Sequence, residues 1–330
     1  MIPRSMPGSS TPPLVCQPLA ISRPWGGERA AAVADVAPPR AGARIGEWWL
    51  LSTRVDYPTR IANEPFAGRL LHDVLARDGA AILGRVFASR RFPLLLKLLD
   101  TEVPLSVQVH PTDALLPGEG KTESWYILDA RPDAAFWLGL AEGATLEQLF
   151  ARVRAGGDPL PLLRRHAAAP GLVAHLPAGI VHALGGGIVA LEVQTSADTT
   201  YRIFDWHREP TRELHLDRAQ TAARADQQVA LPKARPLPPS PPPRDLLVDC
   251  PDYRVERLRL AAPTDLVTAG DRFEILVPLG AALRIAGAAG AVDVPRGHAV
   301  LVPATSGRLL LSPTAPLELL RVLPNHEGSP

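Results

Sequence analysis

Cysteine, net charge and long apolar runs are all scarce in this sequence. Its 330 residues include only two cysteines, Cys16 and Cys250, which lack the close spacing of a metal-binding or redox pair. This favours a reducing compartment, although one distant disulfide stays open. A net charge of +1 gives no overall attraction to nucleic acid or to an anionic membrane. No segment approaches the ~18 apolar residues of a membrane span. We therefore expect a cytoplasmic protein that binds neither nucleic acid nor membrane.

Proline is the residue in excess. The chain contains 36 prolines, roughly twice the usual ~5% share. Proline disfavours long helices and suits short strands joined by tight turns. Since 46% of the residues are hydrophobic, the chain can also form well-packed cores. The sequence therefore predicts a mostly β protein. Its start, MIPRSMPGSSTPPLV, has no apolar core of signal-peptide length and is expected to be a flexible leader.

A proline-rich segment divides the chain. Seven of the 15 residues in LPKARPLPPSPPPRD, residues 231–245, are proline, which predicts an extended connector. The length of the chain suits about two domains. We expect a larger domain over residues 1–230 and a smaller β domain over residues 246–330. A long surface loop within a single domain is the alternative for the proline-rich segment.

Few helices are expected before the connector. Only residues 68–77 and 145–155 have a helical pattern. In the second segment Thr145 can cap the helix. An apolar stripe follows it, made of Leu146, Leu149, Phe150 and Val153.

Short apolar runs separated by glycine and proline follow the connector. They predict a small antiparallel sandwich or jelly roll. The runs are residues 273–277, 283–285, 299–304 and 309–311. His298 has no second candidate ligand nearby, so we expect it to be structural or exposed.

The segment SVQVHP alternates polar and apolar residues with the period of a β-strand. Ser106, Gln108 and His110 therefore share one face of that strand. The apolar run FPLLLKLL precedes it, and another strand-like run carries Glu123 near its start. An amide, an imidazole and a carboxylate that converge inside a β fold form a candidate metal site of the type that suits zinc.

A second polar region begins at the turn PAG, after which His182 opens the next strand. Taken alone, His182 is more often a core histidine than a metal ligand, and only the remaining pattern favours a ligand. The glycines 185–187 let the backbone bend or approach a neighbour closely.

The strand after these glycines carries Glu192 and Gln194 on one face. Arg202 follows within an apolar run. An arginine in that setting either pairs with a buried carboxylate, here Asp205 or Glu192, or faces a cavity that binds an anion. The residues alone leave both interpretations open.

These motifs resemble those of the type I mannose-6-phosphate isomerases, the zinc-dependent cupin phosphomannose isomerases, and in particular their short bacterial form. The segments that carry the resemblance are RPWGG, IGEWWLLS, SVQVHP, GKTESWYIL, PAGIVHAL, EVQTSADTTYRIFDW and GHAVLVPA. They occur in order over nearly the whole chain. The resemblance implies a jelly-roll cupin catalytic domain with a few short helices, followed by a smaller cupin-like β domain.

The resemblance also implies a set of site residues. One zinc ion per chain would be bound by Gln108, His110, Glu123 and His182. The implied catalytic residues are Arg202 and Lys121. The implied substrate-binding residues are Ser106, Lys97 and Glu192. Two simpler roles remain open, because Lys97 could be a strand lysine that extends to solvent and Glu192 could only hold Arg202 in place.

The implied activity is the interconversion of mannose 6-phosphate and fructose 6-phosphate through a zinc-stabilised enediolate. One alternative is a cupin metalloprotein that acts on, or only binds, another sugar phosphate. Another is an iron-dependent oxygenase, since one fold hosts many functions. Such an oxygenase more often uses two histidines and one carboxylate, which Gln108 and Lys121 fit poorly. The sequence does not decide between a monomer and a dimer.

Overall fold

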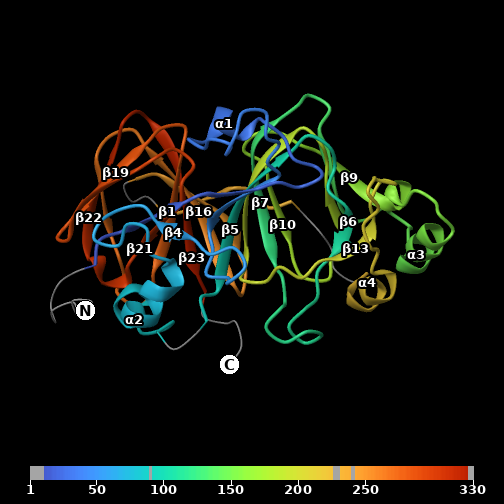
Figure 1. Cartoon of the computed structure of the whole chain (residues 1–330), viewed down its shortest axis with the longest axis horizontal. Helices are drawn as coiled ribbons and strands as arrows, with labels where there is room; N and C mark the ends of the chain where they lie inside the picture. The colour runs from blue at the N-terminus through green and yellow to red at the C-terminus, as the bar shows by residue number, and fades with distance from the viewer. Residues whose placement is uncertain (1–10, 89–90, 226–230, 239–241, 326–330) are drawn as a thin grey trace.

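The computed structural model of the chain describes residues 11–88, 91–225, 231–238 and 242–325. Two β-sandwiches lie side by side, so that four antiparallel sheets follow one another along the long axis (Figure 1). The described chain is thus mostly β, as the abundance of proline predicts.

The first sandwich consists of a five-stranded and a six-stranded sheet. The five-stranded sheet contains, in spatial order, β13 (Tyr201–Phe204), β6 (Val107–Val109), β11 (His182–Leu184), β8 (Ala135–Leu140) and β9 (Leu163–Ala167). The six-stranded sheet contains β10 (Val173–Leu176), β7 (Glu123–Ala130), β12 (Ile188–Thr195), β5 (Leu94–Thr101), β3 (Glu47–Leu51) and β2 (Leu19–Ile21).

The second sandwich consists of an eight-stranded and a four-stranded sheet. The larger sheet contains β14 (Arg235–Pro236), β15 (Arg244–Asp249), β16 (Tyr253–Leu260), β23 (Leu317–Pro324), β18 (Glu274–Leu279), β21 (Val300–Val302), β1 (Leu14–Gln17) and β4 (Arg60–Ile61). The smaller sheet contains β17 (Thr264–Val267), β22 (Arg308–Pro313), β19 (Leu283–Gly287) and β20 (Gly290–Val294). The four apolar runs predicted after the connector all fall on strands of this sandwich.

Alternation along the strands assigns each face to a different core. In β12, Leu191 and Val193 join a core shared with the eight-stranded sheet, whereas Ala190 faces the five-stranded sheet. In β6, Val107 and Val109 pack under the helices, so Gln108 between them faces the interior of the first sandwich. The predicted two-face pattern of this strand is therefore confirmed.

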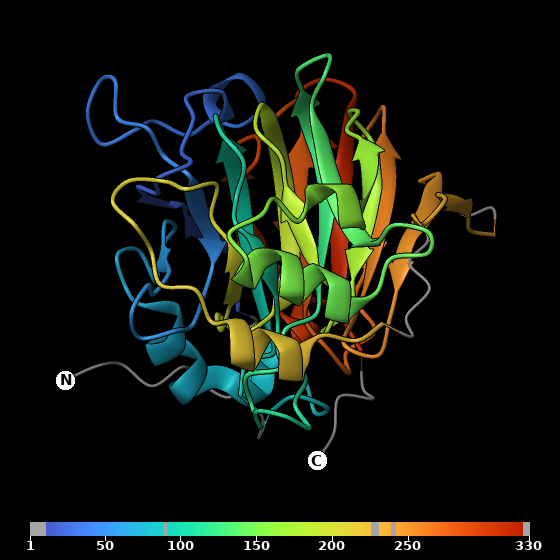
Figure 2. The same ribbon diagram turned by 90° about the vertical axis from the view of Figure 1, so that its right-hand side faces the viewer.

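The described residues form four α-helices beside the sheets. They are α1 (Ala30–Val33), α2 (Leu71–Leu83), α3 (Leu146–Arg154) and α4 (Leu216–Ala222). Two 3-10 turns cover Leu160–Leu162 and Ala304–Ser306. Helices α3 and α4 cover the outer face of the five-stranded sheet, as Figure 2 shows from that side. No helix in the described ranges is long and apolar enough to cross a membrane.

The two predicted helices exist as α2 and α3. Thr145 caps α3 in a capping box with Gln148, which confirms the predicted N-terminus. The prediction of only two helices is wrong, because α1 and α4 are also present. They span only four and seven residues, too few for a helical period to stand out in the sequence.

Only part of the predicted flexible leader lies outside the described residues, and the prediction is wrong for its last residues. Residues 1–10 are not described, but Leu14 and Val15 are buried in β1. β1 pairs with β21 on one side and with β4 on the other. The apolar pair at the end of the leader is thus part of a sheet whose other strands lie far along the chain.

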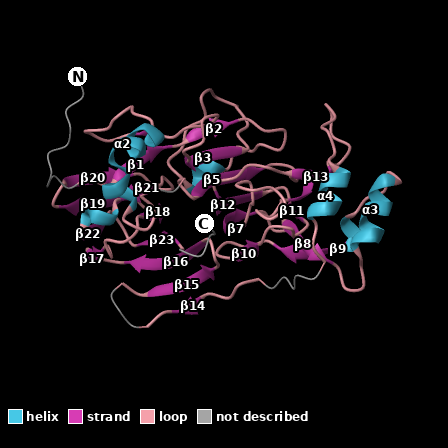
Figure 3. Ribbon diagram, turned by 90° about the horizontal axis from the view of Figure 1, so that it is seen from below, coloured by secondary structure: helices cyan, strands magenta, loops and turns pink. Residues whose placement is uncertain are grey.

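The part of the proline-rich segment that is described follows the edge of the eight-stranded sheet. There β14 pairs with β15, at the margin of the molecule in Figure 3. The three-part division of the chain at residues 231–245 stays a prediction.

Candidate metal centre

The four implied metal ligands come from the two facing sheets of the first sandwich. Gln108 and His182 lie directly opposite each other on the neighbouring strands β6 and β11. His110 follows the end of β6, and Glu123 opens β7 in the six-stranded sheet. All four side chains are buried, and Glu123 is fully inaccessible to solvent.

Backbone carbonyls fix the orientation of both histidine rings. Nδ1 of His110 lies 3.0 Å from the carbonyl oxygen of Thr199, and Nδ1 of His182 lies 2.8 Å from that of Ile180. Because a carbonyl oxygen only accepts, each Nδ1 donates its proton. Each Nε2 then carries a lone pair, which is the tautomer that binds metal ions.

Both Nε2 lone pairs point at one carboxylate. Nε2 of His110 is 3.3 Å from Oε2 of Glu123, and Nε2 of His182 is 3.2 Å from Oε1. His110 Nε2 and both Glu123 oxygens are buried without a hydrogen bond of good geometry. Acceptors that face one another inside a protein are costly unless a cation joins them. The donor atoms of His110, Glu123 and His182 lie within 4.8 Å of one another, and the three residues therefore fit a metal ion.

The local charges keep these donors in the form that binds a metal. Burial, and then the charge of Lys121, lower the pKa of His110 to about 4. Burial alone would raise the pKa of Glu123, but Lys121 and His110 hold it well below its usual value. Nζ of Lys121 lies 2.9 Å from Oε2 of Glu123. The histidine is thus neutral and the carboxylate ionised near pH 7.

Gln108 contributes an amide whose orientation Ser106 stabilises. Its Nε2 lies 3.2 Å from Nε2 of His182, and the Ser106 hydroxyl donates to its Oε1 at 3.2 Å. A hydroxyl both donates and accepts, so Ser106 can also bond the amide after a half-turn that directs Oε1 at the ligand cluster. Gln108 is thereby placed to act as a fourth ligand.

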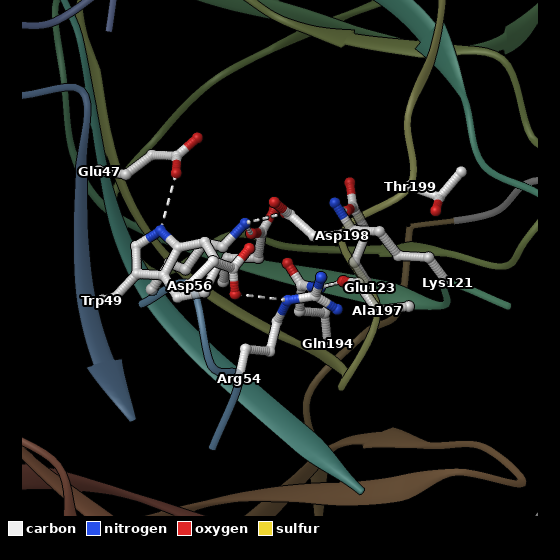
Figure 4. Close-up of polar contacts among 12 residues, drawn as sticks. Glu47, Trp49, Arg54, Asp56, Lys121, Glu123, Gln194, Ala197, Asp198 and Thr199 are labelled. Carbon is white, nitrogen blue, oxygen red and sulfur yellow. Dashed lines mark hydrogen bonds and ion pairs between the residues drawn. The ribbon is translucent and has the colours of Figure 1, made fainter. Parts of the chain in front are cut away.

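A buried lysine lies beside this cluster. Nζ of Lys97 is 3.1 Å from Asp198 Oδ1, 3.7 Å from Glu192 Oε2 and 4.7 Å from the centre of the Trp49 ring. In Figure 4, Glu47 and Trp49 lie at the left and Lys121 lies at the right, with Asp198 and Glu123 between them. Lys97 is only 3% exposed, so it does not extend to solvent.

Three carboxylates determine the protonation of this lysine. Burial opposes its charge, but Glu47, Asp198 and Glu192 together raise its pKa. Burial and the neighbouring Glu123 raise the pKa of Glu192 to about 6. The indole Nε1 of Trp125 donates to Glu192 at 3.1 Å. Glu192 therefore changes its charge close to neutral pH, next to the ligand cluster.

Arg202 shares the face of Gln108, because the two residues lie directly opposite each other on β13 and β6. It forms no ion pair within 4 Å with either carboxylate that the sequence suggests. Its Nη1 instead donates to the carbonyl oxygen of Glu213 at 2.6 Å, and Asp205 is bound by Arg208 and Arg212.

Sequence reasoning missed two kinds of residue at this site. Asp198 and Glu47 lie close to Lys97, and the local sequence around Glu47 gives no sign of that contact. The backbone carbonyls of Thr199 and Ile180 orient the histidines, and no residue type signals that role. The polar run between β12 and β13 was the one available indication for Asp198 and Thr199.

A jelly-roll sandwich whose interior brings two histidines and a glutamate close enough to share a metal ion has the architecture of the metal-binding cupins. Residues 16–137 match the model of the phosphomannose isomerase type I catalytic domain. The chain is 38% identical over 219 residues to a probable mannose-6-phosphate isomerase GmuF of Bacillus subtilis, covering 63% of this chain and 67% of the relative. It is 37% identical to the mannose-6-phosphate isomerase ManA of the same organism, covering 64% and 67% of the two chains.

Structural similarity extends further along the chain. The crystal structure of the mannose 6-phosphate isomerase from Bacillus subtilis superposes with a TM-score of 0.83 at 26% identity, covering 94% of this chain and 99% of that one. The chain belongs to the type I phosphomannose isomerases.

Proposed function

We propose that the chain interconverts mannose 6-phosphate and fructose 6-phosphate with one zinc ion bound by Gln108, His110, Glu123 and His182. The observation that carries this proposal is the buried cluster of facing acceptors, His110 Nε2 and the two Glu123 oxygens, in a chain of this family.

Zinc is the metal that the donor set favours. Imidazole nitrogen and carboxylate oxygen are common zinc donors, and an amide oxygen completes a four-coordinate set. With a single ionised carboxylate among the ligands, a divalent ion leaves a formal charge of about +1. That surplus favours an anionic substrate such as a sugar phosphate.

The reaction moves a proton between C1 and C2 of the open-chain sugar through an enediolate. Bound zinc would supply Lewis-acid stabilisation of the negative charge that develops on the sugar oxygens. Two cationic side chains, Lys121 and Arg202, are proposed as the catalytic residues that hold charge and orient the substrate. Ser106, Lys97 and Glu192 are proposed to line the substrate pocket.

Each of these assignments has a physical basis in the site. Lys121 is buried beside the ligand Glu123. Glu192, whose pKa lies at about 6, can hold or release a proton at a pH close to neutrality. Arg202 shares its sheet face with the ligand Gln108.

We also propose that the protein acts in the reducing cytoplasm. Both cysteines are free thiols, and Cys16 is buried. Burial raises the pKa of Cys16 to about 12 and that of Cys250 to about 11. Neither thiol is therefore ionised enough to react readily near pH 7.

The test is a coupled assay of mannose 6-phosphate conversion with the protein as purified, after metal removal by a chelator, and after zinc is added back. We expect activity to disappear with the metal and to return with zinc. Absence of turnover in the zinc-loaded protein would refute the proposed activity. Recovery of activity with iron but not with zinc would refute the proposal that the metal is zinc.

A further inference from the structure

Two arginines bind one buried carboxylate next to the candidate metal centre, and a third arginine lies nearby. Asp205 is only 6% exposed. Nη1 of Arg208 donates to its Oδ1 at 2.8 Å, and Nε of Arg212 donates to its Oδ2 at 2.7 Å. Nη2 of Arg212 also contacts Oδ1. Asp205 thus holds two guanidinium groups side by side.

Arg202 adds a third guanidinium to this cluster. Burial first, and then the positive charges of Arg212 and Arg208, lower the pKa of Arg202. Its Nε is buried without a hydrogen-bond partner. Glu213 lies nearby, but its carboxylate is 83% exposed to solvent, where water screens its charge. Asp205 is bound by Arg208 and Arg212 but not by Arg202. Three guanidinium groups therefore lie near a single buried carboxylate in this part of the described chain, which leaves a surplus of about two positive charges.

The backbone adopts an unfavourable conformation to bring these arginines together. Trp206 and His207 both have left-handed φ angles, 59° and 51°, although neither is glycine. The turn is closed by a hydrogen bond from the Arg208 amide to the Asp205 carbonyl oxygen at 3.1 Å. Left-handed conformations are costly for bulky residues and persist where the surroundings impose them.

Contacts with two other segments fix the turn and its arginines. The Trp206 indole donates to the carbonyl oxygen of Leu105 at 2.7 Å, and Nη2 of Arg208 donates to that of Pro104 at 2.6 Å. The Arg212 guanidinium lies over the Trp25 ring at 5.1 Å. Both carbonyls immediately precede Ser106, so the turn is attached to the strand that carries the site residues.

The register of the sheet places the cluster beside the candidate ligands. Arg202 lies directly opposite Gln108 and shares its face, and Ser106 lies two residues before Gln108 on that same face. The cationic cluster therefore begins one strand away from the metal ligands and extends towards Ser106.

We infer that Arg202, Arg208 and Arg212, organised by Asp205, form the subsite that binds the phosphate monoester group of the substrate. This inference rests on the proposed function. Guanidinium groups match the geometry of phosphate oxygens and keep their charge at all physiological pH values. A bound phosphate supplies the missing acceptor for Arg202 Nε and neutralises the surplus charge, which no carboxylate of the cluster does.

The test uses inorganic phosphate as the probe, because it represents the anionic group without the sugar. Its dissociation constant is measured by calorimetry on the zinc-loaded wild type and on Arg212→Gln, beside the KM and kcat for mannose 6-phosphate. Loss of a charge-assisted hydrogen bond is worth roughly a tenfold to hundredfold change in affinity. We expect the phosphate dissociation constant and KM to rise by at least about tenfold, with kcat within about threefold and with unchanged zinc content. Arg212→Lys should recover part of the affinity.

Arg257→Gln is the matched control. Arg257 is also a half-buried arginine that binds a buried aspartate, with its Nη2 at 2.8 Å from Asp245, but it lies on β16 in the second sandwich. It should leave phosphate affinity and KM unchanged. Equal effects of Arg212→Gln and Arg257→Gln, or wild-type phosphate affinity in Arg212→Gln, would overturn the inference.

A measurement on the wild type alone covers the case in which Arg212→Gln does not fold. Phosphate should still bind after zinc is removed, because the arginines do not depend on the metal. If removal of zinc abolishes all phosphate binding, the phosphate binds to the metal and not to the arginines, which would overturn the inference. Phosphate binding without isomerisation of mannose 6-phosphate would contradict the proposed function while leaving the subsite intact.

Discussion

Replacement of Lys97 by methionine tests the electrostatic balance of the site. Methionine preserves much of the side-chain volume and removes the charge. Three carboxylates, those of Glu47, Glu192 and Asp198, then lose the cation that they share. All of them lie in or beside the protein interior, so their charges are poorly solvated.

The magnitude follows from the cost of leaving buried charge unpaired. Removal of one partner of a buried ion pair typically destabilises a protein by about 3–5 kcal/mol. Lys97 is 3% exposed and has one carboxylate oxygen at 3.1 Å and another at 3.7 Å. We therefore expect Lys97→Met to lower the free energy of unfolding at pH 7 by about 3–5 kcal/mol.

The penalty should depend on pH in a defined direction. The raised pKa of Lys97 means that its stabilising effect is fully present below its unfolded pKa of about 10.5. In the variant, Glu192 loses a positive neighbour, so its folded pKa rises above the wild-type value of about 6. A carboxyl group whose folded pKa is raised takes up a proton more readily in the folded state, so the variant gains stability as the pH falls from 7 to 5.

The assay is urea unfolding of wild type, Lys97→Met and the exposed control Lys233→Met at pH 7 and pH 5, with chelator present so that metal binding does not contribute. We expect the difference between wild type and Lys97→Met to shrink towards pH 5 and Lys233→Met to match wild type. A Lys97→Met penalty below about 1 kcal/mol, or one that does not change with pH, would refute the reasoning.

Two further predictions concern the ligand cluster and the backbone around it. His182→Ala should lose nearly all bound zinc after dialysis. The control His298→Ala should keep its zinc, because His298 is hydrogen-bonded to the Asp35 carbonyl and lies away from the ligands. If elemental analysis finds about one zinc per chain in His182→Ala, His182 is not a ligand. Gly185→Ala should cost about 3 kcal/mol or more, because its Cβ would lie 1.9 Å from the Ala135 carbonyl oxygen. Gly79→Ala on α2, where a Cβ meets nothing within 4 Å, should instead gain about 0.5–1 kcal/mol, and equal midpoints for these two variants in thermal unfolding would contradict both estimates.

Local patterns predicted much of the first sandwich. The alternation in SVQVHP was enough to assign Gln108 to the interior and Val107 and Val109 to the helix side, because a strand has only two faces. The structure brings His110, Glu123 and His182 together, and their role as zinc ligands, which the resemblance implied, stays a proposal. The close approach expected at the glycines 185–187 is also confirmed, at Gly185.

Features that depend on distant segments were not predictable in the same way. A carboxylate partner for Arg202, either Asp205 or Glu192, was one of the two interpretations that the sequence left open, yet Asp205 pairs with Arg208 and Arg212 instead. The pairing of Asp205 with Arg208 and Arg212 depends on a left-handed backbone at Trp206 and His207. Neither residue type indicates such a turn in the sequence. The leader was misassigned for a similar reason, since the pairing partner of Leu14 lies on β21.

Because β1 pairs with β21, β1 cannot complete its sheet until β21 has been synthesised. Leu14 is synthesised long before its pairing partner Leu301, because nearly 290 residues separate the two along the chain. At about 5–20 residues per second, that interval is on the order of 15–60 s. Throughout it, the apolar side chains of β1 have no sheet to join, and an unpaired strand edge is a template for aggregation. Chaperone demand during translation should therefore centre on this first strand, and its closure should be among the last steps of folding.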